Sequence, residues 1–409
     1  MFIDNLLHDA TCEVTKSLNQ LAININKKYK VDITKQGIDQ RFTGDAVKYV
    51  HALIGNQLSQ QVSHSIDSEW FKLFKRVLIK DSTKFDVSEN LVSQLPGSGG
   101  SASKAGVSIQ HEFDIKAGKV IDLTITPANI PDTKDASNTI GNVQAGDLII
   151  RDLGYSIISC FDIMDKAGAF FISRLNVTII AQEMKDNKLV EIDFVKLKKT
   201  MEEDKLKRLE KQVYVGKRDK FPVRMIIELM PEEVINKRLK NKNSFNKKKG
   251  KQTSDNYKTR ACFNLFITNI KDTVLEAEAI LKIYKIRWQV ELVFKAWKSI
   301  FGIDNNNQMK YERFICTLNI RLLLILINWD LFMHKRLQLY EKTGKLLSIN
   351  KCFKTLQESS KELKEILTNN CKKLVKWLEE ISRLFESHHW IEKKKNKIGL
   401  AELMLLKIL

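Results

Sequence analysis

The chain has 409 residues, of which 68 are Lys or Arg and 49 are Asp or Glu, so its formal net charge at pH 7 is +19. Hydrophobic residues make up 43% of the sequence, which is enough for packed cores and excludes a wholly disordered chain. At ~100–200 residues per domain, the length indicates several domains or one large, elaborated domain. The positive charge predicts a polyanionic partner such as nucleic acid or an anionic membrane surface.

Membrane-spanning and export signals are not apparent in the sequence. The strongest apolar run, 322–327, is far shorter than the ~20 residues needed to cross a bilayer, which favours a buried helix. The first ten residues lack a basic segment followed by an apolar one and a cleavage site. The cysteines form no Cys-x-x-Cys pair and have no histidine at zinc spacing, so we expect reduced thiols in a cytoplasm. They are at positions 12, 160, 262, 316, 352 and 371.

The first 70 residues have the pattern of helices. The segment Ile33–Ile38 is followed by a periodic stretch, Asp45–Ile54, which Thr43 is placed to cap. Two short helices around a glycine-containing turn fit a helix-turn-helix, but the pattern is loose and slightly favours a small helical bundle. We expect this region to contact DNA if the rest of the chain binds DNA.

Strand patterns begin at Arg76. The run Arg76–Lys80 is apolar and ends at Asp81, and a helix is expected from about Tyr155. Further strands are predicted by alternation at period two or by short apolar runs. They are 107–114, 120–126, 148–150 and 169–172. Strands that first pair as hairpins and then alternate with a helix predict a mixed α/β sheet covered by helices.

The segment 176–265 reads as an insertion into this α/β domain. A charged helix is predicted at 196–211, and strands are predicted at 224–229 and 263–268. The lysine-rich stretch Lys237–Lys251 is either a solvated charge run or a contact to the DNA backbone. Its most concentrated part is Lys247, Lys248 and Lys249. After Thr273 the pattern is helical to the end of the chain.

The most informative segment is 283–298, which is predicted to form one helix. At about 100° per residue, Tyr284, Arg287, Glu291 and Lys298 fall on one narrow stripe of an otherwise apolar surface. One interpretation is a helix-surface ion network with an i,i+4 pair of Arg287 and Glu291. The other is a phosphate-handling face. Arg287 and Lys298 would hold phosphates, Tyr284 would donate a hydrogen bond, and Glu291 would bind a divalent cation.

The spacing Tyr-x(2)-Arg-x(3)-Glu-x(6)-Lys in this segment resembles the signature of DDE transposases of bacterial insertion sequences. The resemblance is to the insertion-sequence-four family, in its Tyr-Arg-Glu-Lys signature subgroup. Upstream, 78–83 and 146–155 resemble the segments that carry the first and second catalytic aspartates, and 171–174 resembles the strand that follows. The match in order and content extends from about residue 33 to 305.

The resemblance implies an α/β fold: a ribonuclease-H-like mixed sheet with a mainly β insertion before the catalytic glutamate, flanked by helical N- and C-terminal regions. It divides the chain into an N-terminal DNA-binding region, a discontinuous catalytic domain, a basic insertion and a C-terminal region. Their bounds are 1–70, then 71–175 with 266–309, then 176–265, and finally 310–409.

The resemblance also implies that Asp81, Asp152 and Glu291 are the catalytic acids and metal ligands. Such carboxylates can hold two Mg²⁺ ions about 4 Å apart, with Mn²⁺ as a substitute. Both aspartates are expected at or beside the end of an apolar strand, and Asp86 is the main rival of Asp81. For Trp288, a core position and stacking on an unpaired base are equally expected. Trp297 is expected in the core.

The implied function is a transposase that binds the terminal inverted repeats of its element, cleaves the ends and joins the 3′-hydroxyls to target DNA. Double-stranded DNA is the expected partner, a homodimer in a synaptic complex is expected, and the protein would be cytoplasmic and associated with the nucleoid when bound to DNA. The resemblance, rather than the sequence alone, suggests cleavage through a DNA hairpin intermediate. The alternatives are an inactive or truncated remnant that only binds element ends, and a general nuclease. The C-terminal helices would serve dimerisation or intrachain packing.

Overall fold

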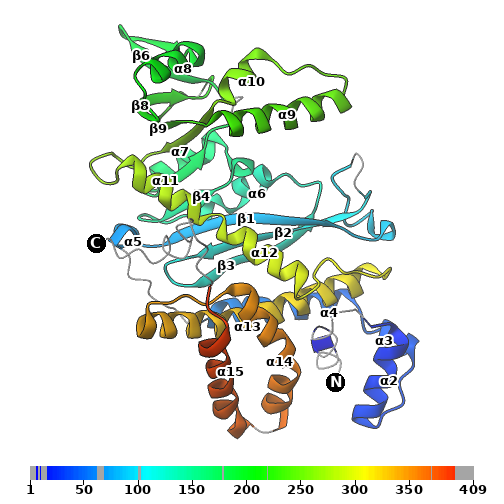
Figure 1. Cartoon of the computed structure of the whole chain (residues 1–409). Coiled ribbons are helices and arrows are strands. Elements are labelled where there is room, and N and C mark those ends of the chain that lie inside the picture. The colour runs from blue at the N-terminus through cyan, green and yellow to red at the C-terminus, as the bar shows by residue number, and fades with distance from the viewer. Residues whose placement is uncertain are drawn as a thin grey trace. The chain divides into compact units, whose positions relative to one another are not determined.

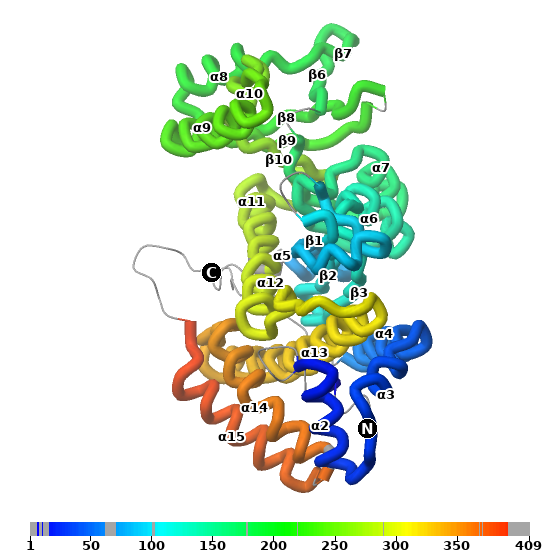
Figure 2. Tube along the Cα trace, turned by 90° about the vertical axis from the view of Figure 1, so that its right-hand side faces the viewer, coloured from blue at the N-terminus to red at the C-terminus, as the bar shows by residue number. Residues whose placement is uncertain are grey.

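The computed structural model describes residues 6–7, 10, 16–61, 69–99, 103–176, 179–218, 220–369 and 371–391 (Figures 1 and 2). The chain divides into two compact units, and each is assembled from segments that are distant in sequence. Unit 1 comprises Met1–Ser68, Asp81–Ile130 and Trp288–Leu409. Unit 2 comprises Glu69–Lys80 and Pro131–Arg287.

Unit 1 begins with short helices, as the sequence predicts. They are α2 (Leu18–Tyr29), α3 (Lys35–Asp39) and α4 (Gly44–Gln60). The Thr43 side chain accepts a hydrogen bond from the backbone N–H of Ala46 at 3.2 Å, so the predicted cap of α4 is confirmed. Helix α4 packs against the long helix α13 (Tyr311–Thr343), where the Gln57 amide donates to Asp330 at 2.7 Å.

The sheet strands of unit 1 are the later part of β1 (Val77–Asp86), β2 (Gly106–Asp114) and β3 (Lys119–Pro127), in the order β3-β2-β1. Strands β2 and β3 form an antiparallel hairpin, as predicted. The expectation that the first strand ends at Asp81 is wrong, because β1 continues to Asp86. In unit 1, residues Asp81–Asp86 continue β1 as the neighbour of β2 in the strand order.

The strands of unit 2 are the first part of β1 and seven more. In sheet order these are β4 (Leu148–Arg151), β5 (Phe170–Arg174), β10 (Phe263–Thr268), β9 (Phe221–Leu229), β8 (Arg208–Val215), β6 (Ala181–Lys185) and β7 (Lys188–Glu191). Strand β4 is parallel to both β1 and β5, whereas the strands from β10 onward pair antiparallel. The predicted mixed α/β sheet is therefore confirmed.

Short helices and 3₁₀ turns join strands of unit 2 in the chain. They include α5 (Glu69–Lys72), α6 (Asp132–Thr139), the 3₁₀ turn η3 (Leu153–Tyr155) and α7 (Ile158–Lys166). Side chains of α7 and the sheet share one hydrophobic core, in which the rings of Phe161 and Phe171 stack at 4.6 Å. The predicted helix begins at Ile158 rather than at Tyr155, because η3 precedes it.

The range 176–265 holds β6 to β9 together with three helices: α8 (Phe194–Glu203), α9 (Glu232–Lys248) and α10 (Asp255–Arg260). The charged helix predicted at 196–211 is only partly correct, because α8 ends at Glu203 and β8 begins at Arg208. Lys205 has a positive φ of 55°, a conformation that ends a helix. Most of the lysine-rich stretch is helical and lies on α9.

Helices fill the chain after Thr273, as expected, through His388. They are α11 (Ala277–Ile286), α12 (Gln289–Ser299), α13, α14 (Ile349–Asn369) and α15 (Leu374–His388). Helices α14 and α15 lie side by side (Figures 1 and 2). The part of this prediction that covers 392–409 lies outside the described residues.

Helix α13 contains the apolar run 322–327, and this run is largely buried, as predicted. By length and composition α13 could cross a membrane, since its best 18-residue window has a mean hydropathy of 1.6. However, 83% of that window is buried inside the molecule. Trp329 on this helix donates to the carbonyl of Gly118 at 3.1 Å, which ties α13 to the β2–β3 turn. The helix is therefore a core element of unit 1.

Candidate active site and DNA-binding residues

In unit 2, one of the predicted catalytic acids lies beside a residue of the signature. Asp152 directly follows β4 and precedes η3. The Arg287 Nη2 atom lies 3.6 Å from the Asp152 Oδ1 atom. The Arg287 side chain is 14% exposed and that of Asp152 is 39% exposed, so the carboxylate stays open to solvent while the guanidinium is mostly enclosed. A partly enclosed guanidinium with five donors can bind a phosphate next to this carboxylate.

Tyr284 belongs to the same group of side chains. It is buried on α11, its ring contacts that of Phe266 at 5.0 Å, and the Arg287 guanidinium lies 5.9 Å from its centroid. Burial raises the pKa of Tyr284 to about 12, against a smaller opposing effect of the Arg287 charge. The phenol is therefore neutral at physiological pH and is able to donate a hydrogen bond.

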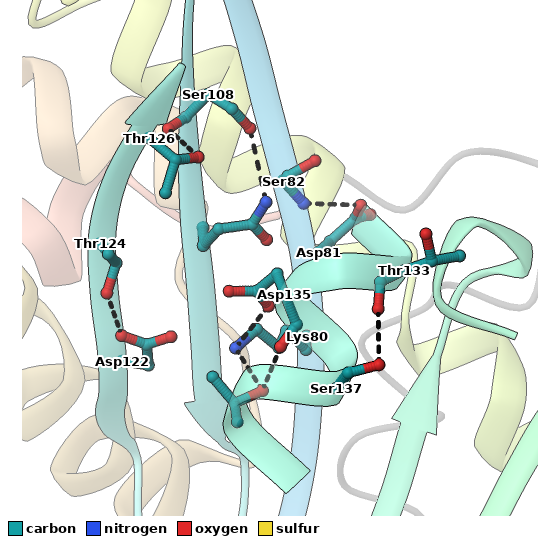
Figure 3. A network of polar contacts seen from close by, with 12 residues as sticks. Lys80, Asp81, Ser82, Ser108, Asp122, Thr124, Thr126, Thr133, Asp135 and Ser137 are labelled. Carbon is teal, nitrogen blue, oxygen red and sulfur yellow. Dashed lines mark hydrogen bonds and ion pairs between the residues drawn. The ribbon is translucent and has the colours of Figure 1, made fainter. Parts of the chain in front are cut away.

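In unit 1, the first predicted acid lies within β1. Asp81 is half-buried, and its Oδ1 atom accepts a hydrogen bond from the backbone N–H of Ser82 at 2.8 Å (Figure 3). Asp86, the rival candidate, is the last residue of the same strand and is exposed. Strand β1 thus presents both candidates in unit 1, and Asp81 is the more enclosed.

The third acid and the signature lysine are on α12, also in unit 1. Glu291 is exposed in the first turn of this helix. The Lys298 ammonium donates to the backbone carbonyl of Lys84 on β1 at 2.9 Å. This bond ties the helix that carries Glu291 to the strand that carries Asp81. The bond to Lys84 uses one of the three ammonium donors of Lys298.

The prediction of one continuous helix over 283–298 is wrong. Helix α11 ends at Ile286 and α12 begins at Gln289, with Arg287 and Trp288 between them. The break arises because the Arg287 backbone N–H bonds to the Tyr284 carbonyl, three residues back instead of four. The four signature residues thus do not form one helical stripe: Tyr284 and Arg287 belong to unit 2, and Glu291 and Lys298 belong to unit 1.

The three acids proposed as metal ligands are divided in the same way. Asp81 and Glu291 belong to unit 1, and Asp152 belongs to unit 2. Within the described ranges, no group of three or more His, Cys, Asp or Glu side chains is assembled to hold a metal ion. The chemistry of the three donors nevertheless fits a hard divalent cation, because Mg²⁺ and Mn²⁺ prefer carboxylate oxygens.

The two signature-region tryptophans differ in burial. Trp297 is 1% exposed and its ring contacts that of His111 at 5.1 Å, so its predicted core position is confirmed. Trp288 is 49% exposed. A half-exposed indole that follows Arg287 directly is available to contact a ligand.

Helix α9 forms a basic, exposed surface in unit 2. Lys247, Lys248 and Lys249 are all exposed at its C-terminal end. The helix is held on the sheet by Arg238, which donates to the carbonyls of Ala261 and Phe263 at 3.0 Å each. The lysines are therefore displayed on an anchored helix.

Sequence reasoning missed two features of this region. It did not place the Arg287 guanidinium beside Asp152, where the structure has it. It also gave no role to the buried lysine that precedes Asp81, although a lysine directly after three apolar strand residues was a visible signal.

Known proteins resemble this chain over most of its length. Residues 72–328 match the family described as Transposase DDE domain. The transposase for insertion sequence element IS231B of Bacillus thuringiensis subsp. berliner is 29% identical over 385 residues, which is 90% of this chain and 80% of the relative. The transposase for IS1151 of Clostridium perfringens is 27% identical over 357 residues, 84% of this chain and 75% of the relative. The chain therefore belongs to the DDE transposase family, whose members are enzymes that act on DNA and use divalent metal ions.

Proposed function

We propose that this transposase binds the terminal inverted repeats of its own insertion sequence, cleaves the DNA at the ends and joins the 3′-hydroxyls to target DNA. The observation that carries the proposal is the group formed by Asp152, Arg287 and Tyr284 in unit 2. It offers a carboxylate for a metal ion next to two donors for a phosphate.

The catalytic carboxylates in this proposal are Asp81, Asp152 and Glu291. Two lines of support come from the fold. Lys80 and Arg151 are register partners on parallel strands, Asp81 follows Lys80 within β1, and Asp152 follows Arg151 directly after the end of β4. Helix α12, which carries Glu291, is bonded to β1 through Lys298. When bound by these carboxylates, two Mg²⁺ ions would activate the attacking oxygen and stabilise the leaving oxygen.

The other signature residues handle the phosphate. Arg287 and Tyr284 donate to its non-bridging oxygens, and the remaining donors of Lys298 do the same from α12. In the cleavage step, a water molecule loses a proton to solvent and its oxygen bonds to phosphorus, while the bond from phosphorus to the 3′ oxygen of the element breaks and that oxygen takes up a proton. In the joining step, that 3′ oxygen loses its proton and bonds to a target phosphorus, and the target strand leaves through its own 3′ oxygen.

DNA is held beyond the scissile phosphate by two further surfaces. Lys247, Lys248 and Lys249 on α9 contact the backbone, a sequence-independent term that weakens with salt. Trp288 stacks on an unpaired base near the element end. Two copies of the chain would hold the two ends in a synaptic complex, in the bacterial cytoplasm.

The test uses the purified chain with a labelled duplex that carries an inverted repeat read from the DNA flanking the gene. With Mg²⁺ or Mn²⁺ we expect cleavage at the repeat end and transfer to a supercoiled target. A duplex of scrambled sequence serves as the control. Equal cleavage of both duplexes would indicate a general nuclease, and binding without cleavage would indicate an end-binding protein.

A further inference from the structure

The residue before Asp81 makes a buried ionic contact in unit 2. Lys80 is 0% exposed, and its ammonium lies 2.9 Å from the Asp135 Oδ2 atom on α6 (Figure 3). The same ammonium donates to the Thr139 hydroxyl at 3.2 Å, and that hydroxyl donates to the Asp135 carbonyl at 2.9 Å. Two residues of α6 thus hold one side chain of β1.

Joining a helix to a strand through this contact requires the desolvation of two charged side chains, which costs free energy. Lysine and aspartate are rarely buried unless paired, and a packed apolar pair usually gives as much stability. The register partner of Lys80 on β4 is Arg151, which is 3% exposed. Two buried cations therefore lie at register positions of neighbouring strands, and Asp135 supplies the carboxylate that pairs with Lys80.

The other end of α6 reaches the segment after Asp152. A Cβ atom on Gly154 would lie 3.2 Å from the Asp132 Oδ2 atom, a tight approach that a glycine allows without displacement. Gly154 is in η3, and η3 packs against α6. One short helix of unit 2 thus contacts both the residue before Asp81 and the turn after Asp152.

We propose that α6, through Asp135 and Thr139, is a positioning element for the two aspartates. The proposal rests on the proposed function, in which Asp81 and Asp152 bind the metal ions. Side chains alternate along a strand, so the face of β1 on which α6 holds Lys80 is opposite to the face on which Asp81 projects. Fixing Lys80 fixes the direction of the Asp81 carboxylate, while Asp132 limits the movement of the turn that follows Asp152. Asp135 and Thr139 touch no reacting atom and act through Lys80.

The experiment uses the double variant Lys80→Met/Asp135→Leu of the full chain, which removes both charges and leaves no unpaired ion. Its control is Lys211→Met/Glu183→Leu, which removes the 2.6 Å ion pair between β8 and β6 of the same unit together with the 2.6 Å pair of Glu183 and Lys185. Each protein is assayed for thermal unfolding, for gel-shift affinity toward the element-end duplex, and for Mn²⁺ binding by the loss of the free-ion electron paramagnetic resonance signal. Cleavage is measured across a Mn²⁺ titration.

For the double variant we expect the Mn²⁺ concentration at half-maximal cleavage and the Mn²⁺ dissociation constant to rise about tenfold. DNA affinity should stay unchanged, and the control pair should match the wild type. Thr139→Val, which leaves the charges in place, should raise the same Mn²⁺ concentration by a smaller factor and covers the case in which the double variant does not fold. Wild-type Mn²⁺ dependence in every folded variant would overturn the positioning role. Failure of the wild type itself to cleave would instead contradict the proposed function.

Discussion

Arg287 lies beside Asp152, with 3.6 Å between the Nη2 atom of one and the Oδ1 atom of the other. The contact joins the residue after α11 to the residue after β4, two positions that are far apart in the sequence. It places the mostly enclosed guanidinium of Arg287 next to a proposed metal ligand. This contact is the arrangement on which the proposed phosphate-binding role of Arg287 rests.

This arrangement predicts a graded effect of Arg287 substitutions. Arg287→Ala should lower the single-turnover cleavage rate by about 10²–10³-fold, as loss of a donor to a developing charge does elsewhere. Arg287→Lys should lose less, because it keeps the charge but not the planar fork of donors. The exposed Arg218 of the same unit provides the control, and Arg218→Ala should cleave as the wild type does. Equal rates for both alanine variants would contradict the role of Arg287.

Substitution of Trp297 on α12 should affect the stability of the fold, whereas substitution of Trp288 in the preceding turn should affect DNA binding. Trp297→Ala should destabilise the fold by about 3–5 kcal/mol, because the side chain is buried against His111. Trp288→Ala should leave unfolding within about 0.5 kcal/mol of the wild type. It should weaken binding to an end duplex with an unpaired base by about 1–3 kcal/mol. Urea unfolding and fluorescence of 2-aminopurine at that base measure the two effects, and an unchanged 2-aminopurine signal would exclude stacking.

The lysines of α9 should set the salt dependence of DNA binding. Replacing Lys247, Lys248 and Lys249 with Gln should reduce the slope of log K against log salt by about 2–3, because fewer DNA phosphates are then neutralised and fewer counterions are released on binding. The control removes the same charge from the C-terminal helical region of unit 1, by changing Lys372, Lys373 and Lys376 to Gln. If both triple variants change the slope equally, net charge rather than α9 determines affinity.

Asp330 should make stability depend on pH. Burial raises its pKa from 3.8 to about 6, against the smaller opposing effect of the Gln57 hydrogen bond. A folded-state pKa above the unfolded value gives stability that is present below pH 3.8 and lost as pH rises through about 6. Asp330→Asn should therefore be more stable than the wild type at pH 8, and this advantage should disappear near pH 4. Urea unfolding at both pH values measures the stability difference between the variant and the wild type. Glu341→Gln, at an exposed position of the same helix, is the control. A stability gain of Asp330→Asn that is equal at both pH values would contradict the prediction.

Most strands could be predicted from the sequence because alternation at period two, or a short apolar run, reports which side chains face a core. Strands β2, β3, β4 and β10 lie where these patterns place them. The pattern failed at β1, whose polar residues after Asp81 gave no strand signal. It also failed at β8, where charged residues at 208–211 read as helix but pair with β9.

The site was harder to predict because its contacts join distant parts of the chain. Periodicity places Tyr284, Arg287, Glu291 and Lys298 on one helical face, and only the backbone hydrogen bond at Arg287 shows that the helix is interrupted. Likewise, the contact of Lys80 with Asp135 depends on how α6 lies on β1, which neither segment encodes alone. The residue types of the site were visible in the sequence, but their partners were not.

The central claim is that Asp81, Asp152 and Glu291 act together as metal-binding carboxylates. It is tested most directly by end-duplex cleavage with Asp81→Asn, Asp152→Asn and Glu291→Gln, beside Asp86→Asn, with gel-shift affinity measured for each. The account predicts that the first three variants bind the duplex as the wild type does yet cleave it at least about 10³-fold more slowly, while Asp86→Asn cleaves normally. Wild-type cleavage by any of the three, or loss of cleavage in Asp86→Asn alone, would contradict the account.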